Sequence, residues 1–84
     1  MDLQEKKRQD KEKVYDILAD KLRVDRSMIK DDSNLRDDLG GDSLDVIEIV
    51  MEIEKEFNMI IEDSLYGKVL TVGDVVKLVE KDND

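Results

Sequence analysis

The feature that most constrains the fold is an apolar pattern of helical period in residues 43–57, SLDVIEIVMEIEKEF. At about 100° per residue, the apolar side chains of this segment separate into two arcs. The wider arc is broad enough to face a core, and it contains Val46, Ile49, Val50, Ile53 and Phe57. The spacing therefore predicts a helix from about Ser43 to Phe57 that is buried along one side.

The narrower arc of the same segment consists of Leu44, Ile47 and Met51. Acidic side chains fill the remaining face of the predicted helix, namely Asp45, Glu48, Glu52 and Glu56. An apolar stripe that is bordered by acids and begins one residue after a serine indicates a contact surface for a partner. A core that is simply wide is the alternative explanation of the same pattern.

Two further segments show helical spacing. A first helix is predicted to end near Leu22 or Arg23, because apolar residues recur at Val14, Ile17, Leu18 and Leu22. A last helix is predicted after the capping box formed by Thr71 and Asp74, with its apolar face made by Val72, Val75, Val76 and Val79.

Residues 64–68 are expected to form a short helix, and the absence of proline favours helices over turn-rich β structure. We therefore predict an all-α fold, a small four-helix bundle of three main helices plus one short helix with a long first loop. That loop carries isolated apolar residues that could hold it across the helix ends, at Val24, Ile29, Leu35 and Leu39.

The chain reads as one domain over residues 14–81, preceded by a charged lead-in over residues 1–13, MDLQEKKRQDKEK. The lead-in is either a frayed terminus or a helical extension that faces solvent. With 84 residues, the chain is near the lower limit for a domain with its own core. Nothing in the pattern requires more than a monomer.

The net charge of −9 is concentrated in the middle of the chain, where residues 30–64 hold twelve acidic and three basic residues. Such a field repels nucleic-acid phosphates and attracts basic protein surfaces. No apolar run is long enough to span a bilayer, and no signal peptide opens the sequence. We therefore expect a cytoplasmic protein that binds basic partners, with no nucleic-acid binding and no membrane insertion.

Ser43 stands behind two glycines in the sequence DDLGGDSLD. A serine at a helix start is most often an N-cap, but Asp42 can cap alone, which leaves the Ser43 hydroxyl free. A hydrolytic nucleophile needs a positioned base, and the chain has neither histidine nor a lysine nearby in sequence. We therefore predict no catalytic residues.

The acidic loop does not fit the spacing of a calcium-binding EF-hand. Placing Gly41 at position 6 of an EF-hand puts Arg36 at position 1 and Ile47 at position 12, and neither can ligate calcium. Placing Gly40 at position 6 fails in the same way. The sequence therefore predicts no specific metal site, although loose binding of divalent ions by surface carboxylates stays open.

The remaining role for Ser43 is that of a residue modified by another enzyme. A phosphate attached there would lie at a helix N-terminus, where backbone N–H groups and the helix dipole favour it. Gly40 and Gly41 let the backbone turn tightly and leave the hydroxyl accessible. The lack of histidine is consistent with this role, because the modifying enzyme supplies the activating groups.

The stretch DDLGGDSLDVIEIVMEIEKEF resembles the signature of the acyl carrier proteins, D-L-G-x-D-S-L followed by an acidic amphipathic helix and a phenylalanine. The similarity continues through TVGDVV and covers residues 14–80. It implies that Ser43 carries 4′-phosphopantetheine, transferred from coenzyme A by a phosphopantetheinyl transferase (holo-acyl carrier protein synthase). It also implies a non-catalytic protein that holds acyl groups as thioesters and presents them to acyl-transfer and fatty-acid synthesis enzymes.

The resemblance further implies that basic patches on those enzymes read the helix after the serine, at Asp42, Leu44, Asp45, Ile47, Glu48, Met51 and Glu52. Candidates for lining a pocket for the acyl chain are Val50, Ile53, Val69 and Val75, for which ordinary core packing is an equal alternative.

The sequence departs from the family pattern at IEDSLY, where I-P-D-E-x-A is frequent, and at LRV, where L-G-V is frequent. Tyr66 could either narrow the acyl tunnel or face solvent. Two alternatives to a fatty-acid carrier stay open, and the departures bear on the first of them. One is a dedicated carrier for polyketide, lipid A, lipoteichoic acid or peptide synthesis. The other is a carrier-like acidic interaction module in which Ser43 stays unmodified.

Overall fold

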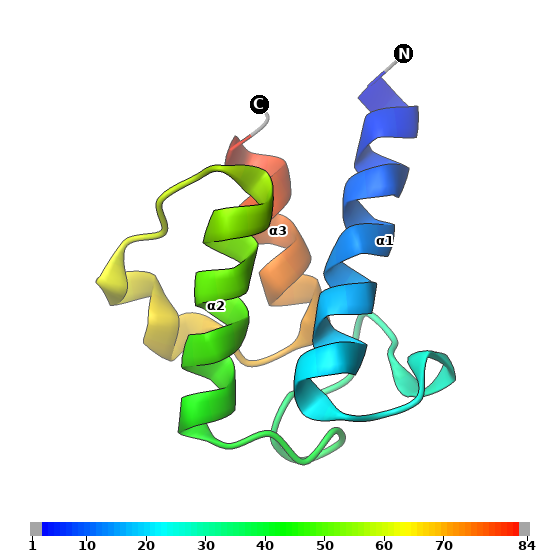
Figure 1. Cartoon of the computed structure of the whole chain (residues 1–84), viewed down its shortest axis with the longest axis vertical. Helices are drawn as coiled ribbons and strands as arrows, with labels where there is room; N and C mark the ends of the chain where they lie inside the picture. Colours follow the sequence, from blue (N-terminus) through cyan, green and yellow to red (C-terminus); the bar gives the residue numbers. More distant parts are fainter. Residues whose placement is uncertain (1–2, 83–84) are drawn as a thin grey trace.

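The computed structural model of the chain describes residues 3–82, which form three α-helices and two short 3-10 helices (Figure 1). In chain order these are α1 (Leu3–Leu22), η1 (Arg26–Met28), α2 (Ser43–Phe57), η2 (Asp63–Lys68) and α3 (Val72–Asp82). The predicted all-α fold of three main helices and one short helix is confirmed. The predicted bounds of the helix over 43–57 agree with those of α2, whereas η1 is a turn of helix that the sequence analysis did not predict.

The charged lead-in is helical over residues 3–13, as part of α1, and residues 1–2 lie outside the described residues. The lead-in does not face solvent throughout, because Asp10 is buried and its carboxylate lies 3.6 Å from the Lys6 ammonium. The division of the chain between residues 13 and 14 stays a prediction.

The first helix ends at Leu22, as predicted, because the next residue takes a left-handed conformation. Arg23 has a φ of 58°, and the Val24 N–H donates to the Ala19 carbonyl at 3.2 Å. Glycine is the residue that this conformation favours. The sequence L-R-V therefore places an arginine in a conformation that favours glycine.

One hydrophobic core lies between the three α-helices, with α1 packed against both α2 and α3. The apolar faces predicted for the helices supply most of its fully buried side chains, including Val14, Leu18, Ile49, Ile53 and Val79. Phe57 differs from the prediction, because it is only half-buried at the end of α2. The Lys13 ammonium lies 5.9 Å from the centre of its ring, so the exposed part of the ring contacts a cation.

The long connection between α1 and α2 crosses the end of the bundle opposite the two termini (Figure 1). Its predicted apolar anchors contact the core, with Ile29, Leu35 and Leu39 buried and Val24 half-buried. Its backbone also pairs with the start of α3. The Leu35 N–H donates to the Leu70 carbonyl at 2.9 Å, and the Val72 N–H donates to the Ser33 carbonyl at 3.0 Å.

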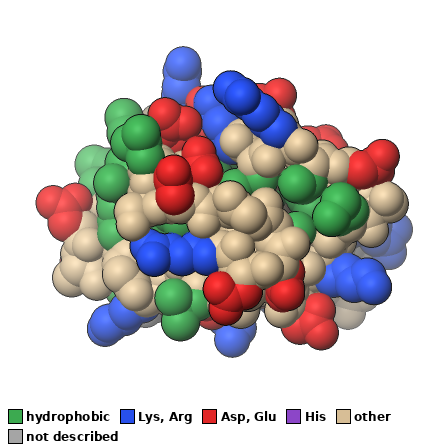
Figure 2. Space-filling model, turned by 90° about the horizontal axis from the view of Figure 1, so that it is seen from below, with side chains coloured by type: hydrophobic (Ala, Val, Ile, Leu, Met, Phe, Trp, Pro, Cys, Tyr) green, Lys and Arg blue, Asp and Glu red, His purple; other side chains and the backbone are tan. Residues whose placement is uncertain are grey.

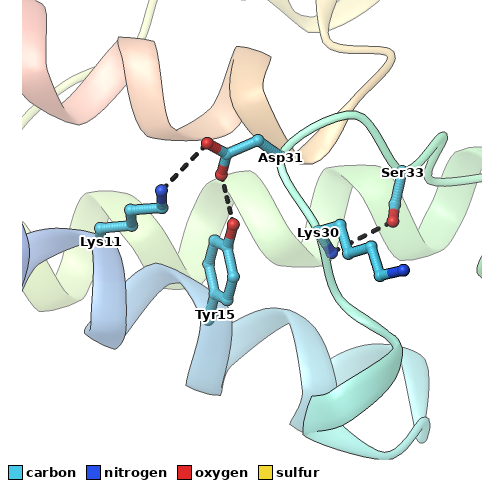
Figure 3. A network of polar contacts seen from close by, with 5 residues as sticks. All are labelled: Lys11, Tyr15, Lys30, Asp31 and Ser33. Atoms are coloured by element: carbon cyan, nitrogen blue, oxygen red, sulfur yellow. Dashed lines mark hydrogen bonds and ion pairs between the residues drawn. The ribbon is translucent and has the colours of Figure 1, made fainter.

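A polar network joins the same connection to α1 (Figure 3). The Asp31 carboxylate accepts hydrogen bonds from the Lys11 ammonium at 2.9 Å and from the Tyr15 hydroxyl. The hydrogen bonds from Tyr15 and then from Lys11 hold the pKa of Asp31 below its usual value. Burial, and then the hydrogen bond to Asp31, raises the pKa of Tyr15 to about 12. The network therefore favours a charged Asp31 and a neutral Tyr15 at neutral pH.

We expect Asp31→Asn to lower the free energy of unfolding at pH 7 by about 0.5–1 kcal/mol, since the network is partly exposed. Because folding depresses the Asp31 pKa, its contribution is complete above the ordinary carboxyl value of 3.8 and is lost as the pH falls through the lower folded value. The difference between wild type and variant should thus shrink below about pH 4. Urea unfolding followed by circular dichroism at several pH values measures it.

Asp32→Asn is the matched control, because Asp32 is an exposed neighbour that carries the same charge. No hydrogen bond or ion pair of its carboxylate occurs among residues 3–82. An equal effect of the two substitutions would show that charge removal, and not the network, changes the stability.

Candidate functional site

The N-terminus of α2 is closed by a reciprocal capping box. The Asp42 carboxylate accepts the Asp45 N–H at 2.9 Å, and the Asp45 carboxylate accepts the Asp42 N–H at 3.0 Å. Asp42 itself is extended, with φ −104° and ψ −175°, as an N-cap residue should be. The cap therefore uses both carboxylates and leaves the Ser43 hydroxyl out of it.

Ser43 is the first residue of α2, and its side chain is exposed. Its Oγ accepts one hydrogen bond, from the guanidinium of Arg36 at 2.7 Å. An exposed hydroxyl at this position is open to an incoming reactant, and any negative charge placed on it would lie at the positive end of the α2 dipole.

A tight turn over residues 34–41 places Arg36 beside Ser43. The Asn34 side chain accepts the Arg36 N–H at 2.9 Å, and the Arg36 carbonyl accepts the Gly40 N–H at 3.0 Å. On either side of Arg36 along the turn, Leu35 and Leu39 are buried in the core. Arg36 is thus held at both its backbone groups, on a turn that is anchored by two apolar side chains.

The two glycines before Asp42 meet different requirements of this turn. Gly40 has a φ of +75°, a conformation that side chains with a Cβ rarely adopt. Gly41 passes close to the end of α1, where an added Cβ would lie 2.7 Å from a terminal methyl of Leu22. The two glycines therefore allow the backbone to pass close to the end of α1 just before it enters α2.

The predicted apolar stripe on α2 is exposed. The exposed fractions are 62% for Leu44, 40% for Ile47 and 58% for Met51. The alternative of a wide core is therefore wrong, because these side chains do not contribute to the buried cluster. Figure 2 views the molecule from the end at which α2 begins, where a group of exposed hydrophobic side chains lies at one edge of the view and others lie elsewhere among acidic and basic side chains.

The acidic residues predicted to bind partners differ in how far they are already engaged. Asp42 and Asp45 hold the capping box, and Asp45 is half-buried. The Glu52 carboxylate lies 3.9 Å from the Lys21 ammonium of α1. Glu48 is exposed, and no hydrogen bond or ion pair of its side chain occurs within residues 3–82. Glu48 is therefore the acid of this set that is most available to a partner.

The four acyl-pocket candidates all lie in the packed core. Val50, Ile53 and Val75 are fully buried, and Val69 is 5% exposed. The structure brings them into one cluster from α2, from the residue after η2 and from α3. Ordinary core packing explains this placement, and a role in holding an acyl chain stays a prediction.

Tyr66 of η2 does not simply face solvent, and its expected narrowing of an acyl tunnel stays a prediction. Its ring is half-buried against the core, and its hydroxyl donates to the Glu54 carboxylate at 3.3 Å. The other oxygen of Glu54 accepts the Ile61 N–H at 2.9 Å. Burial, and then the nearby Glu54 charge, raises the pKa of Tyr66 above its ordinary value. Glu54 thus joins η2 and the chain before it to α2.

The chemistry that the site can perform is limited by its residues. The chain contains no cysteine or histidine, and within residues 3–82 the carboxylates form no group of three that could hold a metal ion. No helix in the described part of the chain has the length and apolarity to cross a membrane. The polar group that the site leaves exposed at the start of α2 is the Ser43 hydroxyl.

Arg36 is the residue of this site that the sequence analysis missed, since it entered there only in the charge count and in the rejected calcium frame. Its signal is weak but present, because it is one of three basic residues in the acidic segment 30–64 and stands seven positions before Ser43.

Comparison with known proteins gives consistent results. Residues 12–79 match the family model described as a phosphopantetheine attachment site. The chain is 45% identical over 69 residues to an acyl carrier protein of Thermotoga maritima, covering 82% of this chain and 85% of that one. Its structure resembles that of a putative acyl carrier protein from Mycobacterium tuberculosis, with a TM-score of 0.81, 35% identity, and coverage of 86% of this chain and 96% of the other.

The capping geometry predicts that the two neighbouring residues differ in their effect on stability. Asp42→Ala should lower the free energy of unfolding by about 1 kcal/mol, because an N–H at the start of α2 loses its acceptor. Ser43→Ala should change it by less than about 0.5 kcal/mol, since the hydroxyl caps nothing. Chemical unfolding of the two unmodified variants measures both values. A loss with Ser43→Ala as large as that with Asp42→Ala would make Ser43 a structural cap.

Proposed function

The chain belongs to the acyl carrier proteins, whose family model contains a phosphopantetheine attachment site, and we propose that Ser43 is the residue to which this group is attached. The protein is a carrier and not an enzyme. The observation that carries the proposal is that the Ser43 hydroxyl is exposed at the start of α2 and is not used for capping.

The surroundings of Ser43 fit a covalently attached phosphodiester. The hydroxyl lies at the positive end of a helix of 15 residues, and a guanidinium is already within hydrogen-bond distance of it. In the attachment reaction the Ser43 oxygen forms a new bond to the pantetheine-bearing phosphorus of coenzyme A, while the P–O bond of the coenzyme's pyrophosphate breaks and adenosine 3′,5′-bisphosphate leaves. The proton of the Ser43 hydroxyl leaves to a base that the transferase supplies, since the chain has no histidine. When bound, the phosphopantetheine arm supplies the thiol that carries an acyl group as a thioester.

The proposed surface for partner enzymes is the outer face of α2. Leu44, Ile47 and Met51 offer exposed apolar area, and Glu48 offers an unengaged carboxylate beside it. An apolar centre with acids around it suits an enzyme whose own surface has an apolar patch ringed by lysine or arginine. The proposed partners are a phosphopantetheinyl transferase and acyl-transfer enzymes of this kind.

The proposed cargo is an acyl group of fatty-acid synthesis, handled in the cytoplasm. The support for this pathway is the acidic, aliphatic character of α2 together with the similarity to a relative named simply an acyl carrier protein. A dedicated carrier of polyketide, lipid A, lipoteichoic acid or peptide synthesis is the alternative, as is an acidic interaction module with unmodified Ser43. Val50, Ile53, Val69 and Val75 are proposed to contact the acyl chain when it enters the core.

The attachment is tested by intact mass before and after incubation with coenzyme A and a broad-specificity phosphopantetheinyl transferase. We expect a gain of one phosphopantetheine in the wild type and none in Ser43→Ala. Ser33→Ala is the matched control and should be loaded like the wild type, because Ser33 is part of the connection and its side chain is buried. A wild-type protein that is folded, unmodified and not loaded would leave the interaction module as the function.

The docking surface is tested by charge reversal. Glu48→Lys should raise the Kd for the transferase by about three- to tenfold without unfolding the protein, and added salt should weaken wild-type binding in the same direction. Glu62→Lys makes the same change on an exposed residue next to η2 and should have a smaller effect. Binding that neither salt nor Glu48→Lys weakens would contradict an electrostatic docking surface.

A further inference from the structure

We propose that Arg36 binds the phosphate of the prosthetic group once Ser43 has been modified, and that it thereby fixes the root of the arm against the start of α2. The proposal rests on attachment at Ser43. It assigns a role to a residue outside α2, on the turn that precedes the helix.

The first support is that the Arg36 side chain already lies where the phosphate would be formed. Its guanidinium donates to the Ser43 Oγ at 2.7 Å. Arg36 is followed directly by Asp37 and Asp38, yet it makes no ion pair with any carboxylate in the part of the chain that the structure describes. A cation in an acidic segment that contacts a neutral hydroxyl retains its charge for an anion that arrives there.

The second support is that the backbone of Arg36 is held in place. The Asn34 side chain accepts the Arg36 N–H, and the Arg36 carbonyl accepts the Gly40 N–H, while the neighbouring Leu35 is fully buried. The turn continues directly into the capping box of α2. The distance between the Arg36 backbone and Ser43 is therefore set by the fold, and the guanidinium contacts the Ser43 hydroxyl before any phosphate is present.

Modification changes what the Ser43 oxygen can offer to the guanidinium. In the unmodified protein this oxygen belongs to a hydroxyl and is a neutral acceptor. After modification it is a phosphoester oxygen and a weak acceptor, but the anionic phosphoryl oxygens lie only two covalent bonds from it. A guanidinium has five N–H donors in a planar fork that matches the oxygens of a phosphate. Hydrogen bonds to a charged acceptor are about twice as strong as neutral ones. The contact should therefore move from the Ser43 oxygen to the phosphate oxygens.

Electrostatics give a reason for the contact. Attachment adds a negative charge next to the carboxylates of Asp42 and Asp45, in a segment that already holds twelve acidic and three basic residues. The start of α2 offsets part of the resulting repulsion through its dipole. The Arg36 guanidinium lies within contact distance of the attachment atom, so it offsets a further part of the repulsion.

The experiment compares unmodified and loaded forms of the wild type, Arg36→Gln and Arg36→Lys. Loading changes the Tm of each protein, and this change should be about 3 °C more positive for the wild type than for Arg36→Gln. This difference is the size expected for one exposed ion pair in a domain of this size. In the loaded Arg36→Gln protein, the phosphorus-31 resonance should narrow and move towards that of a free phosphodiester. Arg36→Lys should give values between those of the wild type and Arg36→Gln, because lysine keeps the positive charge but lacks the planar fork of N–H donors.

Lys30→Gln is the matched control, since it removes one positive charge from the same acidic segment. Lys30 is exposed, and within the described residues its ammonium makes no hydrogen bond or ion pair (Figure 3). This variant should behave as the wild type in both measurements. The proposal is overturned if Arg36→Gln lowers the Tm of the unmodified and loaded proteins equally and leaves the phosphorus-31 signal unchanged. Arg36 would then only stabilise the turn.

A second measurement does not require the variants to be loaded. The side-chain Nε–H signal of Arg36 in the wild type should shift on loading, whereas that of the exposed Arg23 should stay in place. An unchanged Arg36 signal on a protein whose mass shows the attached group overturns the phosphate contact alone. If the intact mass of the protein shows no attached group, the proposed attachment at Ser43 is overturned as well.

Discussion

The site depends on how the connection between α1 and α2 is held across the end of the bundle. Leu35 and Leu39 bury their side chains in the core, and the backbone of the same segment pairs with the first residues of α3. These contacts leave little freedom for the turn over residues 34–41, so the entry of the chain into α2 is fixed. The packing of two aliphatic side chains thereby decides where Ser43 and Arg36 lie, although neither of these takes part in the core.

The carboxylates of the acidic segment differ in whether they have a partner within the described part of the chain. The carboxylates closest to Ser43, those of Asp42 and Asp45, are bound to backbone N–H groups, and Asp31 is bound to Lys11 and Tyr15. Glu48 on the outer face of α2 has no such partner within residues 3–82. Some of the acidity therefore stabilises the fold locally, while the remainder is available to a basic surface. A net charge alone does not distinguish these two uses.

The sequence predicted most of the fold correctly, because the helices are specified by local signals. The period of the apolar residues and the Asp42 and Thr71 caps gave the position of α2 and the start of α3. The prediction was less accurate where distant segments meet. Phe57 was assigned to the core from its place on the helix, yet the end of α2 leaves it half-exposed. The single turn η1 has too few residues for a periodic pattern to reveal it.

The sequence by itself determined that this is a small helical protein with an amphipathic, acidic second helix and a hydroxyl at its start, because each of these properties depends on residues close together in the chain. Only the tertiary structure decided which apolar residues of α2 are exposed and which basic residue faces Ser43. The contact between Arg36 and Ser43 joins residues seven positions apart across a non-helical turn, and no period describes such a turn. Its geometry follows from the burial of Leu35 and Leu39 in the core that all three α-helices share.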